Sequence, residues 1–142
     1  MAGAFGLRFG RFLASAGVGV ALAMAGGCAI IERAAVEESK QQVAERAQER
    51  WDFLMKGQVE RAYEYFSPTS RETLGLEAFK RRSGTTRLWR RTQLEKVDCQ
   101  ADACKVTMTL EYDMREFKGL KTTVEEAWVK DSGTWWLVAP RR

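Results

Sequence analysis

The sequence contains no histidine. Histidine is the side chain that most often acts as a general base near neutral pH, and it is also the commonest ligand of transition metals. Its absence excludes every nucleophile arrangement of the Ser-His or Cys-His type. Together with the aspartates and tyrosines discussed below, this absence leads us to predict that the protein is not an enzyme and that it holds no cofactor.

Cysteine is scarce as well, with three residues in the whole chain: Cys28, Cys99 and Cys104. Two neighbouring thiols without a histidine or a third cysteine nearby cannot supply the four ligands of a structural zinc site, so no metal is expected. Cys99 and Cys104 form an even pair that can bridge in an oxidising compartment. A redox-active pair is the alternative, although such pairs are typically C-x-x-C at the start of a helix.

Neither sign of charge dominates the chain. It has 23 Lys and Arg residues against 19 Asp and Glu residues, for a formal net charge of +4. Arg8 and Arg11 are the only charged residues within residues 1–27, so the rest of the chain, about 115 residues, carries a charge of about +2. That length is enough for one small domain, and its nearly balanced surface predicts no nucleic-acid partner.

A long hydrophobic run is also lacking. Residues 12–27 carry no charge, but this stretch is rich in Gly and shorter than the roughly 20 residues that a membrane-spanning helix needs. With Arg8 and Arg11 in front of it, the pattern indicates an export signal, and an uncleaved signal anchor is the alternative. Residues 25–28 (Ala-Gly-Gly-Cys) resemble the end of bacterial lipoprotein signals, in which small residues precede a cysteine that is lipidated.

This resemblance implies three segments: a signal peptide over residues 1–27, a lipid-anchored helical stalk over residues 28–42 and a folded domain over residues 43–142. Cys28 would become the first residue of the mature protein and carry the acyl chains, palmitate among them. Each buried CH₂ group contributes about 0.8 kcal/mol, so several chains anchor a protein stably. The resemblance implies a place on the periplasmic side of the bacterial envelope, and Ala29 after the cysteine favours the outer membrane.

The first half of the domain has the apolar spacing of amphipathic helices. A helix is predicted over residues 32–56, which lack Gly and Pro and place five apolar residues on one face: Val36, Val43, Ala47, Trp51 and Leu54. Gly57 ends this helix. A second helix is predicted over residues 59–66, stopped by Ser67 and Pro68. Ser70 is expected to cap a third helix that reaches Lys80, with Gly84 as its exit.

From Arg87 onward the apolar period changes to two, which is typical of strands. The clearest alternation runs through residues 105–114, with Val106, Met108, Leu110, Tyr112 and Met114 on one face. Strands are predicted over residues 88–99, 105–114, 121–130 and 134–139, joined by short links such as Asp131-Ser132-Gly133. We expect an antiparallel meander in which a bridge between Cys99 and Cys104 fixes the register of the first hairpin.

Helices followed by a curved antiparallel sheet are the element order of the nuclear transport factor 2-like superfamily, which residues 43–139 resemble. The positions that carry the resemblance are Trp51, Lys56-Gly57, Ala62-Tyr63, Phe66-Ser67-Pro68, Arg71, Leu74, Phe79, Trp128 and residues 132–138. The resemblance implies an α+β fold, a cone in which N-terminal helices pack on a curved antiparallel sheet. Such a cone can enclose a pocket, which the superfamily uses for catalysis, for ligand binding or only for association.

Members that resemble ketosteroid isomerase use a pocket aspartate as a base. Asp98 and Asp113 are the strand aspartates of this chain, and Asp113 falls on the polar face opposite Tyr112, away from the cone interior. Tyr63 and Tyr112 could donate hydrogen bonds to a bound carbonyl. The alternative is that both tyrosines are core residues whose hydroxyls have other partners, and we expect no catalytic residue.

Aromatic residues form the possible pocket: Trp51, Tyr63, Phe66, Phe79, Tyr112, Trp128 and Trp136, with Trp89 in the same set. The alternative is that they simply form the core of a small domain. Adjacent residues of a strand face opposite sides, so Trp135 and Trp136 cannot both point inward. We assign Trp136 to the pocket and Trp135 to an interface.

A basic stretch adds to this possible interface, with no acidic residue among its members: Lys80, Arg81, Arg82, Arg87, Arg90 and Arg91. In an exported protein it suits an anionic surface, and a solvated basic face is the alternative. The sequence therefore predicts a lipid-anchored envelope protein that serves as a non-catalytic binding or assembly module for a protein partner. The alternative function is a pocket binder, or an enzyme, for a small apolar ligand in the cone interior.

Overall fold

The computed structural model describes residues 27–84 and 86–140. The helical half comprises α1 (Gly27–Met55), α2 (Val59–Tyr63), α3 (Pro68–Leu74), α4 (Leu76–Ser83) and the short 3₁₀ helix η1 (Thr86–Leu88). Four strands follow: β1 (Trp89–Gln100), β2 (Ala103–Met114), β3 (Phe117–Asp131) and β4 (Thr134–Val138). The expected signal segment up to residue 26 lies outside the described residues, and so does the side chain of Cys28.

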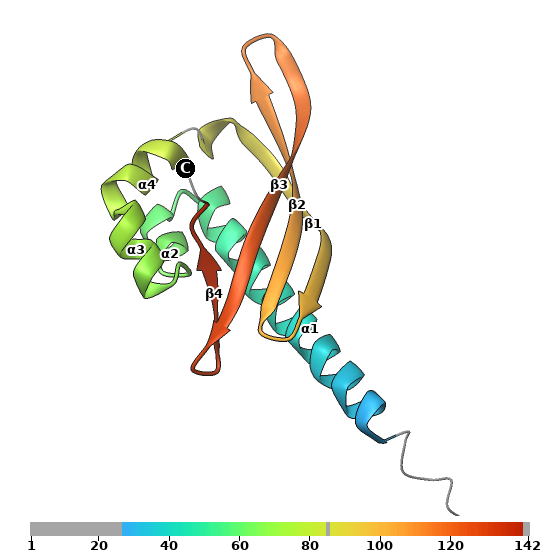
Figure 1. Cartoon of the computed structure of the whole chain (residues 1–142). Helices are drawn as coiled ribbons and strands as arrows, with labels where there is room; N and C mark the ends of the chain where they lie inside the picture. The colour runs from blue at the N-terminus through green and yellow to red at the C-terminus, as the bar shows by residue number, and fades with distance from the viewer. Residues whose placement is uncertain (1–26, 85, 141–142) are drawn as a thin grey trace, which may run out of the picture.

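The strands form one antiparallel sheet in the order β1-β2-β3-β4, and the helices lie on one side of it (Figure 1). The helical half is joined to β4, because Leu137 bonds the backbone of both Tyr65 and Ser67, at 2.8 and 2.9 Å. The far end of the β2–β3 hairpin projects beyond the helices (Figure 1). These observations confirm the predicted α+β class, with N-terminal helices packed on an antiparallel meander.

Helix α1 is longer than predicted, beginning at Gly27. Its side chains from Ala29 to Ala35 are exposed, and the fully buried face starts at Val43. The helix ends before Gly57, whose φ of 72° is a left-handed conformation that glycine adopts without strain. No helix in the described part of the chain combines the length and the apolar run that crossing a membrane requires.

The predicted third helix is two helices, α3 and α4, because Gly75 between them has a φ of 68°. The expected cap at Ser70 was wrong. Ser67 is the cap, since its Oγ accepts a hydrogen bond from the Ser70 backbone N–H at 3.2 Å. Pro68 therefore starts α3, at a position where its missing N–H is no loss. Helix α2 ends at Tyr63, which leaves Phe66 free to bridge to Leu137 of β4.

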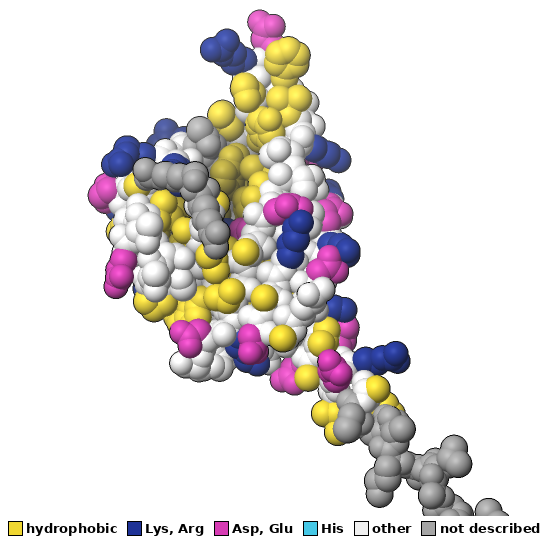
Figure 2. Space-filling view, in the orientation of Figure 1, with side chains coloured by type: hydrophobic (Ala, Val, Ile, Leu, Met, Phe, Trp, Pro, Cys, Tyr) yellow, Lys and Arg dark blue, Asp and Glu magenta, His cyan; other side chains and the backbone are white. Residues whose placement is uncertain are grey.

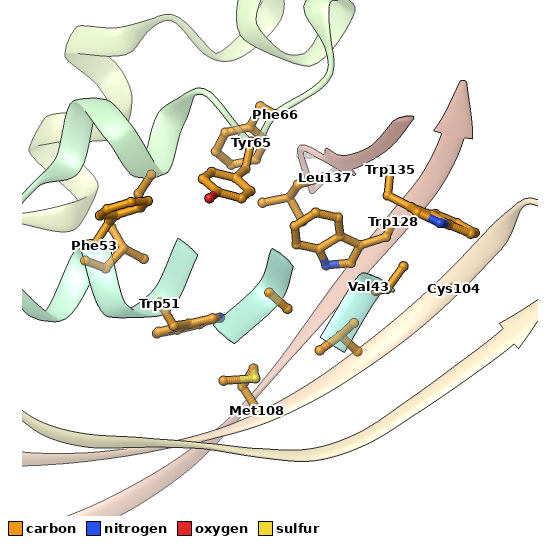
Figure 3. Packing of buried hydrophobic residues seen from close by; sticks show 14 of the residues in the cluster. Val43, Trp51, Phe53, Tyr65, Phe66, Cys104, Met108, Trp128, Trp135 and Leu137 are labelled. Atoms are coloured by element: carbon orange, nitrogen blue, oxygen red, sulfur yellow. The ribbon is translucent and has the colours of Figure 1, made fainter. Parts of the chain in front are cut away.

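The core lies between α1 and the inward face of the sheet. Figure 3 shows Val43 of α1, Met108 of β2 and Trp128 of β3 converging there, and all three are fully buried. The predicted alternation of β2 is confirmed as far as Leu110. Met114 is 46% exposed, however, because the hairpin extends past the helices that cover the rest of the sheet. An alternating pattern identifies a face without showing what covers it.

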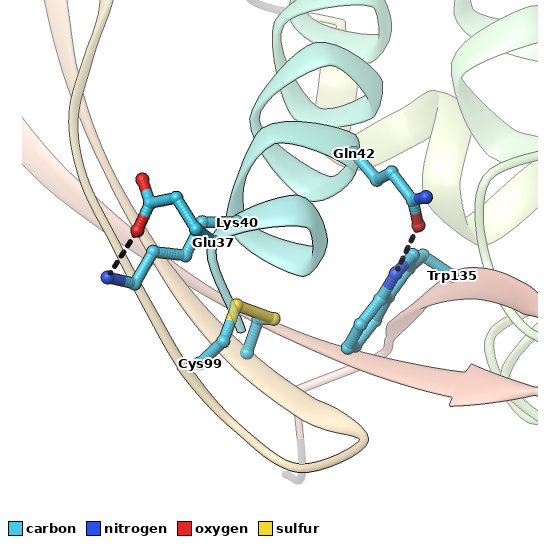
Figure 4. Close-up of a disulfide and its surroundings, with 6 residues drawn as sticks. Glu37, Lys40, Gln42, Cys99 and Trp135 are labelled. Carbon is cyan, nitrogen blue, oxygen red and sulfur yellow. Dashed lines mark hydrogen bonds and ion pairs between the residues drawn. A yellow bond between two sulfur atoms is a disulfide. The ribbon is translucent and has the colours of Figure 1, made fainter. Parts of the chain in front are cut away.

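The predicted disulfide between Cys99 and Cys104 is present (Figure 4). The two residues face each other across β1 and β2 with their Cα atoms 4.1 Å apart. The strands continue one pair further, to Gln100 and Ala103, so the turn itself is shorter than the loop between the cysteines. The bridge therefore fixes the register of the hairpin at its last but one pair.

Replacing both cysteines with alanine is expected to lower the free energy of unfolding by about 2 kcal/mol, because the closed loop is small. Urea unfolding of the oxidised protein and of the variant measures the difference. Adding a reducing agent should reproduce this loss in the natural protein and leave the variant unchanged. Equal stability of the oxidised protein and the variant would show that the bridge contributes nothing.

Candidate functional site

A cavity of about 500 Å³ lies between the helices and strands β3 and β4. Helix α1 contributes Arg50, Trp51 and Leu54 to its wall, and Leu74 and Phe79 line it from α3 and α4. Figure 2 shows apolar side chains gathered in the hollow between the helical side and the sheet. The volume is within the range of small-molecule sites in proteins, and most lining side chains are apolar.

A buried ion pair is the main polar feature of the cavity wall. Arg50 is 6% exposed and Glu126 is 7% exposed, and Arg50 Nη1 lies 2.5 Å from Glu126 Oε1. The indole N–H of Trp51 donates to the same oxygen at 2.9 Å, and the indole N–H of Trp128 donates to Oε2 at 3.1 Å. Both carboxylate oxygens of Glu126 are therefore bound by N–H donors.

The guanidinium of Arg50 is enclosed by aromatic rings. Its Cζ lies 5.4 Å from the centre of the Phe66 ring, 5.6 Å from that of Trp51 and 6.0 Å from that of Phe79. Burial lowers the pKa of Arg50 from its usual value, and the charge of Glu126 acts in the opposite direction. Arg50 Nε is buried and has no hydrogen-bond partner among the described residues.

Sequence reasoning missed both members of this pair. Glutamate and arginine are seldom buried, and Glu126 is separated from Arg50 by 76 positions. One signal was present, because Glu126 is two residues before Trp128 in a strand and therefore faces the same side. The side chain of Trp128 thus marked Glu126 as an inward-facing acid.

The residues that the sequence assigned to a pocket are not all brought together. Trp51, Phe66 and Phe79 line the cavity together with Trp89, but Tyr63, Tyr112, Trp128 and Trp136 are not among its lining residues. The Tyr63 hydroxyl donates to the backbone oxygen of Arg71 at 2.6 Å, so it is a satisfied core group. Tyr112 lies further along β2, paired with Trp89 and Leu120. Trp128 is fully buried, and its indole N–H donates to Glu126.

Neither of the two adjacent tryptophans takes the place that the sequence assigned to it. Trp135 is 2% exposed and belongs to the core, and its indole N–H donates to Gln42 of α1 at 3.2 Å (Figure 4). Trp136 is half-buried beside the guanidinium groups of Arg46 and Arg71. Strand pairing explains the difference. Leu137 lies opposite the inward-facing Trp128 and therefore faces inward itself. Trp135 is two residues before Leu137 on the same strand, so it faces inward too. Trp135 is therefore not an exposed interface residue.

The basic stretch is partly neutralised by acids from elsewhere in the chain. Lys80 lies 2.7 Å from Glu60, and Arg90 Nε lies 2.7 Å from Asp113 Oδ2. Arg91 donates to the side chain of Gln93. Arg81, Arg82 and Arg87 are exposed, and Arg82 also lines the cavity, which places a cation at its rim.

Neither Asp98 nor Asp113 lines the cavity. Asp98 pairs with Lys96 at 2.7 Å. Asp113 of β2 accepts hydrogen bonds from the Gly119 backbone N–H of β3 and from Arg90 of β1, and thereby connects β2 to both of its neighbouring strands. Within the described residues, no group of three Cys, Asp or Glu side chains is arranged to hold a metal ion.

Acidification is expected to loosen this end of the hairpin. The Gly119 N–H and Arg90 lower the pKa of Asp113 below its usual 3.8. Because the pKa of Asp113 is lower in the folded state than in the unfolded state, its charged carboxylate stabilises the hairpin at pH values above the unfolded pKa. This stabilisation disappears as the pH falls through the folded pKa. An NMR titration of the Gly119 amide should show a midpoint below 3.8, and Asp113→Asn should abolish the transition. A midpoint at or above the usual value would contradict the assignment.

Comparison with known proteins shows the fold alone. No family model matches this sequence, and no curated protein matches it. Among solved structures, a candidate NTF2-like transpeptidase from Campylobacter jejuni matches with a TM-score of 0.54 and 11% identity, over 66% of this chain and 94% of its own. A SEC-C motif containing protein from Rhodopseudomonas palustris matches with a TM-score of 0.51 and 10% identity, over 66% and 73% of the two chains. The chain therefore has the nuclear transport factor 2-like fold.

Proposed function

We propose that this protein is a non-catalytic ligand-binding module of the bacterial envelope, and that its cavity takes up a small apolar molecule. The observation that carries the proposal is the cavity of about 500 Å³, lined by aliphatic and aromatic side chains around one buried ion pair. A largely apolar cavity with a few convergent polar groups is the usual form of a small-molecule site. This observation favours the pocket binder over the assembly module that the sequence favoured.

The bonding of Glu126 supports binding over catalysis. A general base needs a carboxylate oxygen directed at the proton that it removes. Both oxygens of Glu126 instead accept N–H groups from Arg50, Trp51 and Trp128. These bonds make Glu126 suited to hold Arg50 in place within the cavity wall.

Filling the cavity tests the proposal. Val124 lines the cavity from β3, whereas Val129 lies on the opposite face of the same strand. Calorimetry with naphthalene should detect binding to the natural protein and to Val129→Trp, and none to Val124→Trp. Thermal unfolding of both variants controls for the fold. Undiminished binding to a folded Val124→Trp, or no binding to the natural protein, would contradict the proposal.

The proposed place in the envelope depends on Cys28. Two observations support a lipid anchor there: the small residues before the cysteine, and the exposed first turns of α1, which lead away from the domain. Cys28→Ser is expected to convert a membrane-extracted protein into a soluble or unprocessed one, since the acyl chains would be the attachment. Fractionation of cells measures this. A processed Cys28→Ser protein that stays in the membrane fraction would remove the lipid anchor from the proposal.

Association with another protein is a second candidate function, which the projecting hairpin favours. Phe117 at its end is 67% exposed and lies close to the exposed Met114. Large exposed apolar side chains that gather at one end of a molecule often mark a contact site. Phe117→Ser should then remove a protein that otherwise co-purifies with this chain in stoichiometric amount, while leaving ligand binding in the cavity unchanged.

A further inference from the structure

We infer that the ligand of this cavity is an uncharged apolar molecule with one hydrogen-bond acceptor, such as a carbonyl oxygen, and that Arg50 binds this acceptor. The inference rests on the proposed function, because it specifies the chemistry of the molecule that the cavity would hold. Three observations carry it: the unused donors of Arg50, the charge already present beside it, and the apolar surface of the remaining wall.

Arg50 has more donors than the protein uses. A guanidinium has five N–H groups, and within residues 27–84 and 86–140 the structure gives it one hydrogen bond, from Nη1 to Glu126. The rings of Trp51, Phe66 and Phe79 lie around the group, and Nε has no partner among the described residues. Since buried donors without partners are unfavourable, an acceptor on the ligand would satisfy donors that the protein leaves free.

The charge of the site favours a neutral acceptor over an anion. Glu126 already supplies the negative charge that balances Arg50. The other two charged residues of the wall, Arg82 and Glu125, are both exposed, and Glu125 is paired with Lys105 at 2.6 Å. A ligand carboxylate bound at Arg50 would therefore be a second buried anion next to Glu126 without a cation of its own.

The rest of the wall is suited to an apolar body. Trp51 and Trp89 lie with their ring centres 5.6 Å apart, and both line the cavity. Beyond Trp89 the same inward face continues along the hairpin through Tyr112 and Leu120, which are paired residues. The cavity thus has its buried polar group on α1 and an apolar surface extending toward the projecting end of the sheet (Figure 2).

Three matched probes test the inference: naphthalene, acetylnaphthalene and naphthoate, which share one ring system and differ in the acceptor. Calorimetry on the purified protein should give acetylnaphthalene an affinity about tenfold or more above that of naphthalene, as expected for a hydrogen bond to a charged donor. Naphthoate should bind most weakly. Equal affinities for naphthalene and acetylnaphthalene, or the highest affinity for naphthoate, would overturn the inference and leave the proposed function standing. Failure of all three probes to bind would overturn both.

Variants locate the donor. In the double variant Arg50→Met with Glu126→Gln, which removes both charges together, naphthalene binding should persist and the preference for acetylnaphthalene should disappear. Arg82→Gln is the control at the rim and should leave this preference unchanged. Loss of the preference in Arg82→Gln, or its survival in a folded double variant, would overturn the assignment to Arg50.

A measurement on the natural protein keeps the test independent of variants. The infrared carbonyl stretch of bound acetylnaphthalene should lie below its frequency in a hydrocarbon solvent, because a hydrogen bond to a cation weakens the carbonyl bond. A bound probe whose carbonyl stretch matches the hydrocarbon value has no such bond, and this result would also overturn the inference.

Discussion

Glu126→Leu is expected to lower the free energy of unfolding by about 3–5 kcal/mol, because it leaves the charge of Arg50 buried without its partner. The indole N–H groups of Trp51 and Trp128 lose their acceptor in the same change. Urea unfolding of the two proteins measures the difference. Adding Arg50→Met to Glu126→Leu should recover much of the loss, since an uncharged pair of apolar side chains has no unpaired charge.

The neighbouring residue provides a matched control. Glu125 is exposed and pairs with Lys105 at the surface, where an ion pair contributes only about 0–1 kcal/mol. Glu125→Leu should therefore change the stability by at most about this amount. If the two variants lose equal stability, the ion pair of Arg50 and Glu126 is not the buried interaction that the structure describes.

Trp135→Ala is expected to lower the free energy of unfolding by about 3–5 kcal/mol, because it removes a fully buried ring and leaves a cavity against α1. Trp136→Ala should lower it by only about 1–2 kcal/mol, the amount that cation–π contacts to Arg46 and Arg71 provide. Thermal or urea unfolding of the two variants compares adjacent residues of the same type. A larger loss for Trp136→Ala would mean that β4 has the opposite face turned inward.

The sequence predicted the features that depend on neighbouring residues. Alternation over residues 105–114 identified a strand, and the two cysteines marked the turn between β1 and β2. The apolar spacing of α1 correctly placed Val43, Ala47, Trp51 and Leu54 in the core. Each of these features is determined within one element or one hairpin, so a single sequence contains the information.

Features that depend on contacts between distant elements were missed. Nothing local to α1 shows that Arg50 is covered by β3, and nothing local to β3 shows that Glu126 meets a cation. The orientation of β4 depends on the pairing of Leu137 with Trp128, which adjacent tryptophans do not reveal. The basic stretch likewise has no acid in its own sequence, although Asp113 and Glu60 pair with it in the fold.

The most direct test of the proposed binding function is mass spectrometry of the protein extracted in mild detergent from its own cells at natural abundance. We predict a small uncharged molecule bound in a near-stoichiometric amount to the natural protein and to Val129→Trp, and absent from Val124→Trp. Natural protein that carries no small molecule, but retains a stoichiometric protein partner, would contradict the binding function and identify an assembly subunit instead.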